Sequence, residues 1–421
     1  MSGLLDALRR PGPASLLIGT LALVIRLAYW GAAGTPAELK GDALEYHTYA
    51  VSMLDDHEFS GHGGDRAGRT PGYPVFLAMI YALSGRSGAA VVAVQCLLGA
   101  LTCLLLFYVA GRLLDPPWPL VCGLAGTVYF GLVGPTSLLL SECLYGFLLM
   151  LSAAALFHQG STTGRRAFLG GSLLGCTYLV RPEILPAAGL FLILSDRLIS
   201  GFRRKDMLLG LAGFCLLAGL WAGRNAAVLG RLVPASSRGG SNVYQGLYLP
   251  LRDTGMTKEP FYRPPPGLSE TEKDARYVAE FKRLWSDVGW GVKIKAYAYN
   301  TLSMLYPFLP GYDATFVILL PFWAFGIWAC RRRREWWLFG GIVLFSLATY
   351  TVFGGPVSRY RQGFSPYLIL LGALGMSALL ERVHARAFAR GAASWAGLNL
   401  LIWAFSSQIR QMVLWLRSAI W

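Results

Sequence analysis

The sequence predicts an all-α, polytopic membrane protein, and three features of its composition lead to that class. Of its 421 residues, 54% are apolar, only 14% are charged, and the mean hydropathy is +0.46. Long uncharged runs recur along the whole chain, and a helix needs about 17–25 such residues to cross the hydrocarbon core of a membrane. A soluble chain of this length has no way to bury so much apolar surface.

About eleven apolar segments are predicted as spans of one integral membrane domain, residues 1–421. They lie near residues 14–31, 90–111, 117–138, 143–158, 167–180, 183–197, 206–222, 313–330, 336–354, 364–381 and 392–406. The first segment reads equally as a signal peptide followed by "GAAGTPA", but Arg26 interrupts its apolar core. We therefore expect an uncleaved first helix.

Basic residues collect in alternate loops between these segments. Counted from a cytoplasmic N-terminus with Arg9 and Arg10, every short basic loop, including "RRRR" at 331–334, falls on the same side. The excess of 38 Lys and Arg over 23 Asp and Glu therefore follows membrane topology and does not indicate a nucleic-acid partner. We expect a multi-pass protein of the inner (plasma) membrane with a cytoplasmic N-terminus.

Two long polar segments then face the extracytoplasmic side, residues 32–89 and 223–312. The second contains "SETEKDARYVAEFKRLW", an amphipathic helix that begins at a Ser-x-x-Glu capping signal. Residues 407–421 alternate basic residues with Trp and Leu, as expected of an interfacial C-terminal helix.

The first polar segment contains the strongest candidate for catalysis. Asp42, Tyr46, Tyr49 and Met53 fall at i, i+4, i+7 and i+11, so they share one helical face. Asp42 begins that helix, where the macrodipole favours an ionised carboxylate. The segment continues to "RTPGYP" and the short apolar helix "VFLAMIYALSG", in which prolines exclude a helix interior before residue 75.

More charged and polar residues recur at the extracytoplasmic ends of later spans. Charges at membrane depth are costly and tend to face a cavity or a partner, so their convergence favours one site. They are Glu142, Arg181, Glu183, Arg224, Asn225, Arg359 and Arg361. Taken singly, each is equally well explained as a solvated loop residue, and the histidines of the first loop show no convincing metal-ligand spacing.

The ordered motifs resemble those of GT-C glycosyltransferases of the protein O-mannosyltransferase and lipid A aminoarabinose transferase type. The motifs are "D…Y…A" after the first helix, then "R-x-PGYP", "SE", "RPE", "GRN…G" and "RYR…P". The resemblance implies a GT-C fold and transfer of a sugar from a polyprenyl phosphate, with inversion, to an acceptor at the extracytoplasmic face. This chain departs from the family pattern in two ways. It has a single Asp42 with Glu45 three residues later, where the family has an adjacent Asp-Glu pair, and it lacks the large C-terminal soluble domain of some relatives.

That resemblance suggests a role for each candidate residue. Asp42 is the expected base for the acceptor hydroxyl, and arginines neutralise the leaving phosphate without need of an acid. The expected phosphate-binding residues are Arg359, Arg361, Arg181 and Lys40. Glu142, Glu45 and Tyr46 are expected to orient the acceptor, or Asp42 and Glu142 to hold a divalent cation (Mg or Mn). Arg69, Tyr73, Arg224 and Asn225 are expected to shape the loop or acceptor site.

Other function classes stay open at this point. A transporter or flippase of a lipid-linked saccharide is also polytopic, but its charges typically lie near the bilayer midplane on broken helices. A lipopolysaccharide ligase-like enzyme is expected to place a histidine in a large late loop, and residues 223–312 contain none. The sequence predicts a donor carried on a polyprenyl phosphate, with undecaprenyl phosphate favoured by composition. The acceptor is a glycan, a lipid or a protein, offering a hydroxyl or a phosphate.

Overall fold

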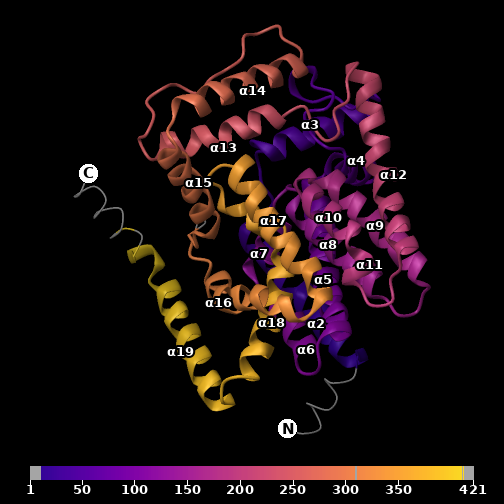
Figure 1. Cartoon of the computed structure of the whole chain (residues 1–421), viewed down its shortest axis with the longest axis vertical. Helices are drawn as coiled ribbons and strands as arrows, with labels where there is room; N and C mark the ends of the chain where they lie inside the picture. Colours follow the sequence, from indigo (N-terminus) through magenta and orange to yellow (C-terminus); the bar gives the residue numbers. More distant parts are fainter. Residues whose placement is uncertain (1–10, 309–310, 410, 412–421) are drawn as a thin grey trace.

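The computed structural model describes residues 11–308, 311–409 and 411, and over this range the chain is helical, with short 3-10 turns and no strand (Figure 1). The predicted all-α class is confirmed. Arg9, Arg10 and most of the predicted C-terminal helix 407–421 lie outside the described residues.

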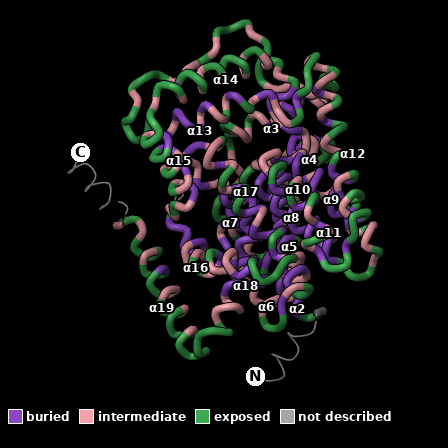
Figure 2. Tube along the Cα trace, viewed as in Figure 1, coloured by how far each residue is buried: buried purple, intermediate pink, exposed green. Residues whose placement is uncertain are grey.

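Apolar helices form the body of the molecule. Figure 2 shows its buried residues concentrated there. These helices are α2 (Pro11–Ala33), α5 (Gly88–Leu113), α6 (Trp118–Val128), α7 (Phe130–Val133), α8 (Glu142–Phe157), α9 (Thr163–Val180), α10 (Leu185–Ile193), α11 (Ser195–Leu198), α12 (Arg204–Leu229), α16 (Ala314–Ala329), α17 (Trp337–Phe353), α18 (Ser365–Leu380) and α19 (Ala385–Ala404).

Small residues let some of these helices pack closely, as is typical of membrane helices. On α9, a Cβ added to Gly171 would lie 2.0 Å from the carbonyl oxygen of Gly210 on α12. Any larger residue at position 171 would therefore force these two helices apart.

Each predicted span is helical, but the spans predicted at 117–138 and 183–197 are divided between shorter helices, and not every helix is long enough to cross a membrane. Within the described residues, five helices pass a length and hydropathy criterion, or six if α6 and the bent segment after it form one span with a 65° bend. Four more apolar helices, among them α8, α10 and α18, are shorter. The protein is a multi-pass membrane protein, and the count of eleven spans stays a prediction.

The two polar segments build a separate layer at one end of this body. Figure 1 shows α3, α13 and α14 together at that end, with α2 and α6 reaching the other. We call these three helices the cap layer. Its members are α3 (Asp42–Asp55), α13 (Gly239–Asp253) and α14 (Glu270–Asp287), flanked by α4 (Gly72–Ser84) and α15 (Trp290–Leu305).

Local sequence explains how the helices of this layer begin. The capping box at the start of α14 is confirmed: Ser269 accepts from the N–H of Glu272, whose carboxylate accepts from the N–H of Ser269. The helix predicted after "RTPGYP" starts at Gly72, three residues earlier than expected, because Pro74 is tolerated within a first helical turn. Likewise α12 continues to Leu229, past its predicted end at residue 222.

Candidate active site

A cavity of about 290 Å³ lies beneath the cap layer, where α3 and α13 meet the ends of α8, α9 and α17. Five separate parts of the chain supply its walls. The polar and aromatic residues among them are Asp42, Glu45, Tyr46, Arg69, Thr70, Ser141, Glu142, Arg181, Glu183, Ser236, Arg238, Ser241, Asn242, Gln245, Tyr350, Phe353 and Tyr360.

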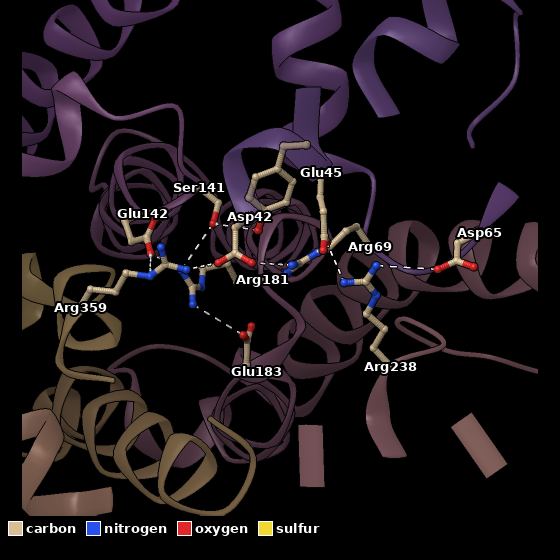
Figure 3. A network of polar contacts seen from close by, with 11 residues as sticks. Asp42, Glu45, Asp65, Arg69, Ser141, Glu142, Arg181, Glu183, Arg238 and Arg359 are labelled. Atoms are coloured by element: carbon tan, nitrogen blue, oxygen red, sulfur yellow. Dashed lines mark hydrogen bonds and ion pairs between the residues drawn. The ribbon is translucent and has the colours of Figure 1, made fainter. Parts of the chain in front are cut away.

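Asp42 is the first residue of α3 and projects into a pair of guanidinium groups (Figure 3). Gly41, with φ of 55°, precedes it and turns the chain into the helix. Oδ1 accepts from Nη2 of Arg69 at 2.5 Å, and Oδ2 accepts from Nη2 of Arg359. Both oxygens of the candidate base are therefore occupied by cations.

Glu45, one turn further along α3, joins two loops across the cavity. Its Oε2 accepts from Nε of Arg69 and from Nη1 of Arg238, each at 2.7 Å. Burial acts to raise the pKa of this carboxyl group, but the charges of the two arginines outweigh burial and hold the pKa below its usual value. Arg238 also lies 3.8 Å from Asp65 of the first loop.

Arg181 occupies the deepest part of the site and is 6% exposed. Its guanidinium lies 3.0 Å from Glu142 and 3.7 Å from Glu183. The rings of Tyr145, Tyr350 and Tyr360 surround it at 5.6–5.9 Å. An arginine stays charged in such surroundings, so this aromatic enclosure strengthens its attraction to the two carboxylates.

Arg359 connects these two groups of charges. It contacts Asp42, and its Nε lies 3.7 Å from Oε1 of Glu142. Burial is the main cause of a lowered pKa for its guanidinium, which nevertheless remains protonated. Its Nε and Oε2 of Glu142 are buried without a hydrogen-bond partner in the described structure.

Carboxylates and guanidiniums thus alternate through the site (Figure 3). Asp42, Glu45, Glu142 and Glu183 are joined to Arg69, Arg181, Arg238 and Arg359. Since the charges of these eight groups cancel, an anion that enters competes with the carboxylates for the arginines.

Arg361 requires a correction, because the structure gives it no place in the cavity. Its guanidinium is 4% exposed and lies 3.1 Å from Asp313, and it donates to the carbonyls of Met304 and Tyr306 at 3.0 and 2.7 Å. Successive residues of a 3-10 helix point in different directions, so Arg359 and Arg361 face different surroundings. We do not retain the phosphate-binding role for Arg361.

Lys40 and Tyr73 also lie outside the cavity lining. The side chain of Lys40 is 76% exposed and pairs with Glu38 at 2.9 Å. Tyr73 is fully buried and donates to Oε1 of Gln95 at 2.9 Å. The first residue is thus an exposed surface residue and the second a core residue.

Arg224 and Asn225 of α12 contact two different polar segments, the first loop and the stretch that follows α12. Arg224 stacks on Phe59 and Trp221 and donates to the carbonyl of Arg66. Asn225 is fully buried and donates to the carbonyl of Val233 at 2.9 Å. Neither residue lines the cavity, and a role in shaping the acceptor site stays a prediction.

Sequence reasoning missed Arg238, Asn242, Gln245 and the tyrosines of α17 and the following turn. Polar residues in a long loop look like ordinary solvated residues. The only available signal was the spacing of Tyr244 and Tyr248, which marks a buried helical face and leaves Asn242 and Gln245 on its edge.

The expected divalent cation does not fit the residues present. Within the described ranges, no three His, Cys, Asp or Glu residues come together in a group suited to a metal ion. The two proposed ligands, Asp42 and Glu142, face arginines, which a cation would have to displace. We therefore assign no step to a metal.

No family model matches the sequence, and no curated protein matches it either. Solved structures do match. The oligosaccharyltransferase of Archaeoglobus fulgidus, in its apo form, superposes with a TM-score of 0.50 at 13% identity, over 93% of this chain and 54% of that protein. ArnT from Cupriavidus metallidurans, solved bound to undecaprenyl phosphate, gives 0.53 at 14% identity over 92% and 64%.

This chain therefore spans between half and two thirds of the length of the two solved proteins. The similarity extends over nearly all of its own helices, and both proteins are glycosyltransferases of the GT-C type. The chain has the GT-C glycosyltransferase fold.

Proposed function

We propose that this protein is an inverting glycosyltransferase that moves a sugar from a polyprenyl phosphate to an acceptor hydroxyl at the extracytoplasmic face of the inner membrane. The observation that carries the proposal is the position of Asp42, at the wall of a cavity, between Arg69 and Arg359. The GT-C fold supports it, because the same fold in ArnT was solved with undecaprenyl phosphate bound.

The reaction is a single displacement at the anomeric carbon. The acceptor oxygen forms a bond to that carbon while the bond from carbon to phosphate oxygen breaks, and the phosphate leaves with the electron pair. The proton of the acceptor hydroxyl passes to the carboxylate of Asp42. Arg359 stabilises the phosphate as its charge develops, so no acid is needed at the leaving group. One base without a second nucleophilic carboxylate is consistent with inversion.

The pairing of Asp42 gives the two substrates an order. With both oxygens bound to arginines, Asp42 has a weakened capacity to accept a proton. The donor phosphate competes for Arg359, and its binding frees one oxygen of Asp42 for the acceptor. Donor binding therefore precedes productive acceptor binding.

Binding of undecaprenyl phosphate, without sugar, to the purified protein tests this proposal. We expect saturable binding that Arg359→Ala weakens at least ten-fold, since a hydrogen bond to a charged group contributes about 1.5–3 kcal/mol. Arg252→Ala is the matched control, because Arg252 is exposed at the end of α13 and pairs with Asp253 outside the cavity. Equal affinities for wild type and Arg359→Ala, or no binding to folded wild type, would contradict the proposal.

A further inference from the structure

One edge of α13 brings uncharged hydrogen-bonding groups to the cavity. Resting on the proposed function, we infer that Asn242 and Gln245, with the ring of Phe353, form the subsite for the hydroxyl groups of the transferred sugar. These residues lie along the cavity wall formed by α13 and the end of α17, one turn of α13 beyond Arg238 of the charge network.

The position of α13 is fixed by its contacts with α17 and α15. A Cβ added to Gly246 would lie 1.8 Å from the carbonyl oxygen of Val352, so the two backbones are in direct contact. Asn300 of α15 donates to the carbonyls of Gly246 and Thr351 at 2.7 and 2.9 Å. Gln245, the residue before Gly246, therefore projects from a rigid part of the wall.

The opposite face of α13 is buried in an aromatic cluster. Tyr244, Leu247, Tyr248 and Leu251 pack there against residues of α14 and of the loop between α13 and α14. Because these side chains fix the rotation of the helix, the edge that carries Asn242 and Gln245 stays directed at the cavity.

The two amides are available to a ligand. Within the described structure, neither the Asn242 nor the Gln245 side chain makes a hydrogen bond to protein, whereas the charged groups of the network are paired with one another. Each amide offers donors and an acceptor at once, which matches a sugar hydroxyl that both donates and accepts. An anion would instead prefer the arginines, and a lipid tail would leave both amides unpaired.

Phe353 adds an apolar surface beside these amides. It is 43% exposed although it lines a cavity of otherwise polar character. Two residues later, a Cβ added to Gly355 would lie 3.8 Å from the carbonyl oxygen of Gln245, so this stretch of chain runs alongside α13. A pyranose ring has both polar edges and an apolar C–H face, and an aromatic ring next to amides suits both.

The test compares binding of the bare carrier with binding of the same carrier bearing a sugar. The probes are undecaprenyl phosphate and undecaprenyl phosphates that carry glucose, mannose, galactose or N-acetylglucosamine. We expect at least one sugar to strengthen binding to wild type about ten-fold over the bare carrier. Gln245→Ala and Asn242→Ala should each remove most of that gain and leave affinity for the bare carrier unchanged. Gln159→Ala, which removes an amide that binds Arg112 outside the cavity, is the matched control.

The outcomes separate this inference from the function on which it rests. If the bare carrier binds but none of the four sugars adds affinity, or if the sugar-dependent gain survives both amide variants, the subsite is wrong and the donor proposal stands. If folded wild type binds neither the bare nor the sugar-bearing carriers, the donor proposal fails and the subsite fails with it.

Discussion

Arginines inside the helical body and arginines around the cavity differ in what they bind. Inside the body, Arg26 donates to the carbonyls of Ala22, Gly126 and Leu132, and Arg361 donates to two carbonyls and to Asp313. At the cavity, the ion pairs of Arg359 are with the carboxylates of Asp42 and Glu142. Carbonyls belong to the backbone and cannot be released, whereas a carboxylate can be exchanged for a phosphate. We therefore expect the partner, more than the arginine itself, to distinguish a structural arginine from one able to bind an anion.

The largest effect should come from the carboxylate that Arg359 holds. Asp42→Asn removes the base, and we expect transfer to fall about 10³-fold, since general base catalysis contributes roughly 10²–10⁴-fold. The same variant should bind undecaprenyl phosphate more tightly than wild type, because Arg359 loses a competing anion. Turnover assays and carrier binding measure the two effects. Near-normal turnover would show that Asp42 is not the base. Weaker carrier binding would contradict the proposal that Asp42 and the phosphate compete for Arg359.

The next largest effect should be a difference in folding stability between variants of Arg361 and Arg359. Arg361→Ala leaves Asp313 charged and buried, and breaking such a pair costs about 3–5 kcal/mol. Arg359→Ala affects a side chain that is 34% exposed, and we expect it to cost less than about 1 kcal/mol. Thermal unfolding of both variants in detergent measures the difference. Similar losses in Tm for the two variants would contradict the distinction between a structural Arg361 and an Arg359 that can exchange its partner.

A smaller effect is expected at Glu270, which fastens the cap layer to the first loop. Its carboxylate accepts from the N–H groups of Arg66 and Ala67 at 2.9 and 3.0 Å and from the hydroxyl of Ser237 at 2.5 Å. Glu270→Ala leaves these donors unpaired, at a cost of about 1–3 kcal/mol. We expect faster proteolysis of the first loop and weaker carrier binding, because Arg69 and Arg238 follow these anchored residues. Lys282→Ala, on an exposed part of α14, is the control, and equal cleavage rates would exclude the anchoring role.

Acidification should produce the smallest effect, through Glu45. Because the folded-state pKa of Glu45 is lowered from 4.5, its contribution to stability is fully present above that value and is lost as pH falls through the folded-state pKa. Melting curves of wild type and Glu45→Gln from about pH 3 to about pH 7 measure it. The advantage of wild type should shrink below pH 4.5. If the stability difference between wild type and Glu45→Gln instead grew as the pH fell, the lowered pKa of Glu45 would be contradicted.

Local features of this chain were predictable because they depend on neighbouring residues. The helix beginning at Asp42, the cap at Ser269 and the positions of the apolar helices follow from spacing, capping and hydropathy. Which helices cross the membrane was not predictable from hydropathy alone. The segment predicted at 183–197 is divided between α10 and α11 and contains no single helix of spanning length.

Contacts between residues far apart in the sequence could not be predicted. Asp42 and Arg359 are 317 positions apart, and nothing in either local sequence identifies the other as its partner. The sequence also gave Arg359 and Arg361 the same role, because their different surroundings arise only when the 3-10 turn packs against α15 and Asp313. Gln245 was missed for the same reason, since its position depends on the contact between Gly246 and Val352.

The distance in sequence between the two halves of the site has a consequence for biosynthesis. A ribosome delivers Asp42 and Arg69 to the membrane long before Arg359, which follows α17 near the end of the chain. Until that late turn is inserted, Asp42 lacks one of its two arginines and the cavity lacks the wall formed by Tyr350, Phe353 and Tyr360. In a growing chain the charge network and the cavity wall are therefore incomplete until α17 and the turn after it join the other helices.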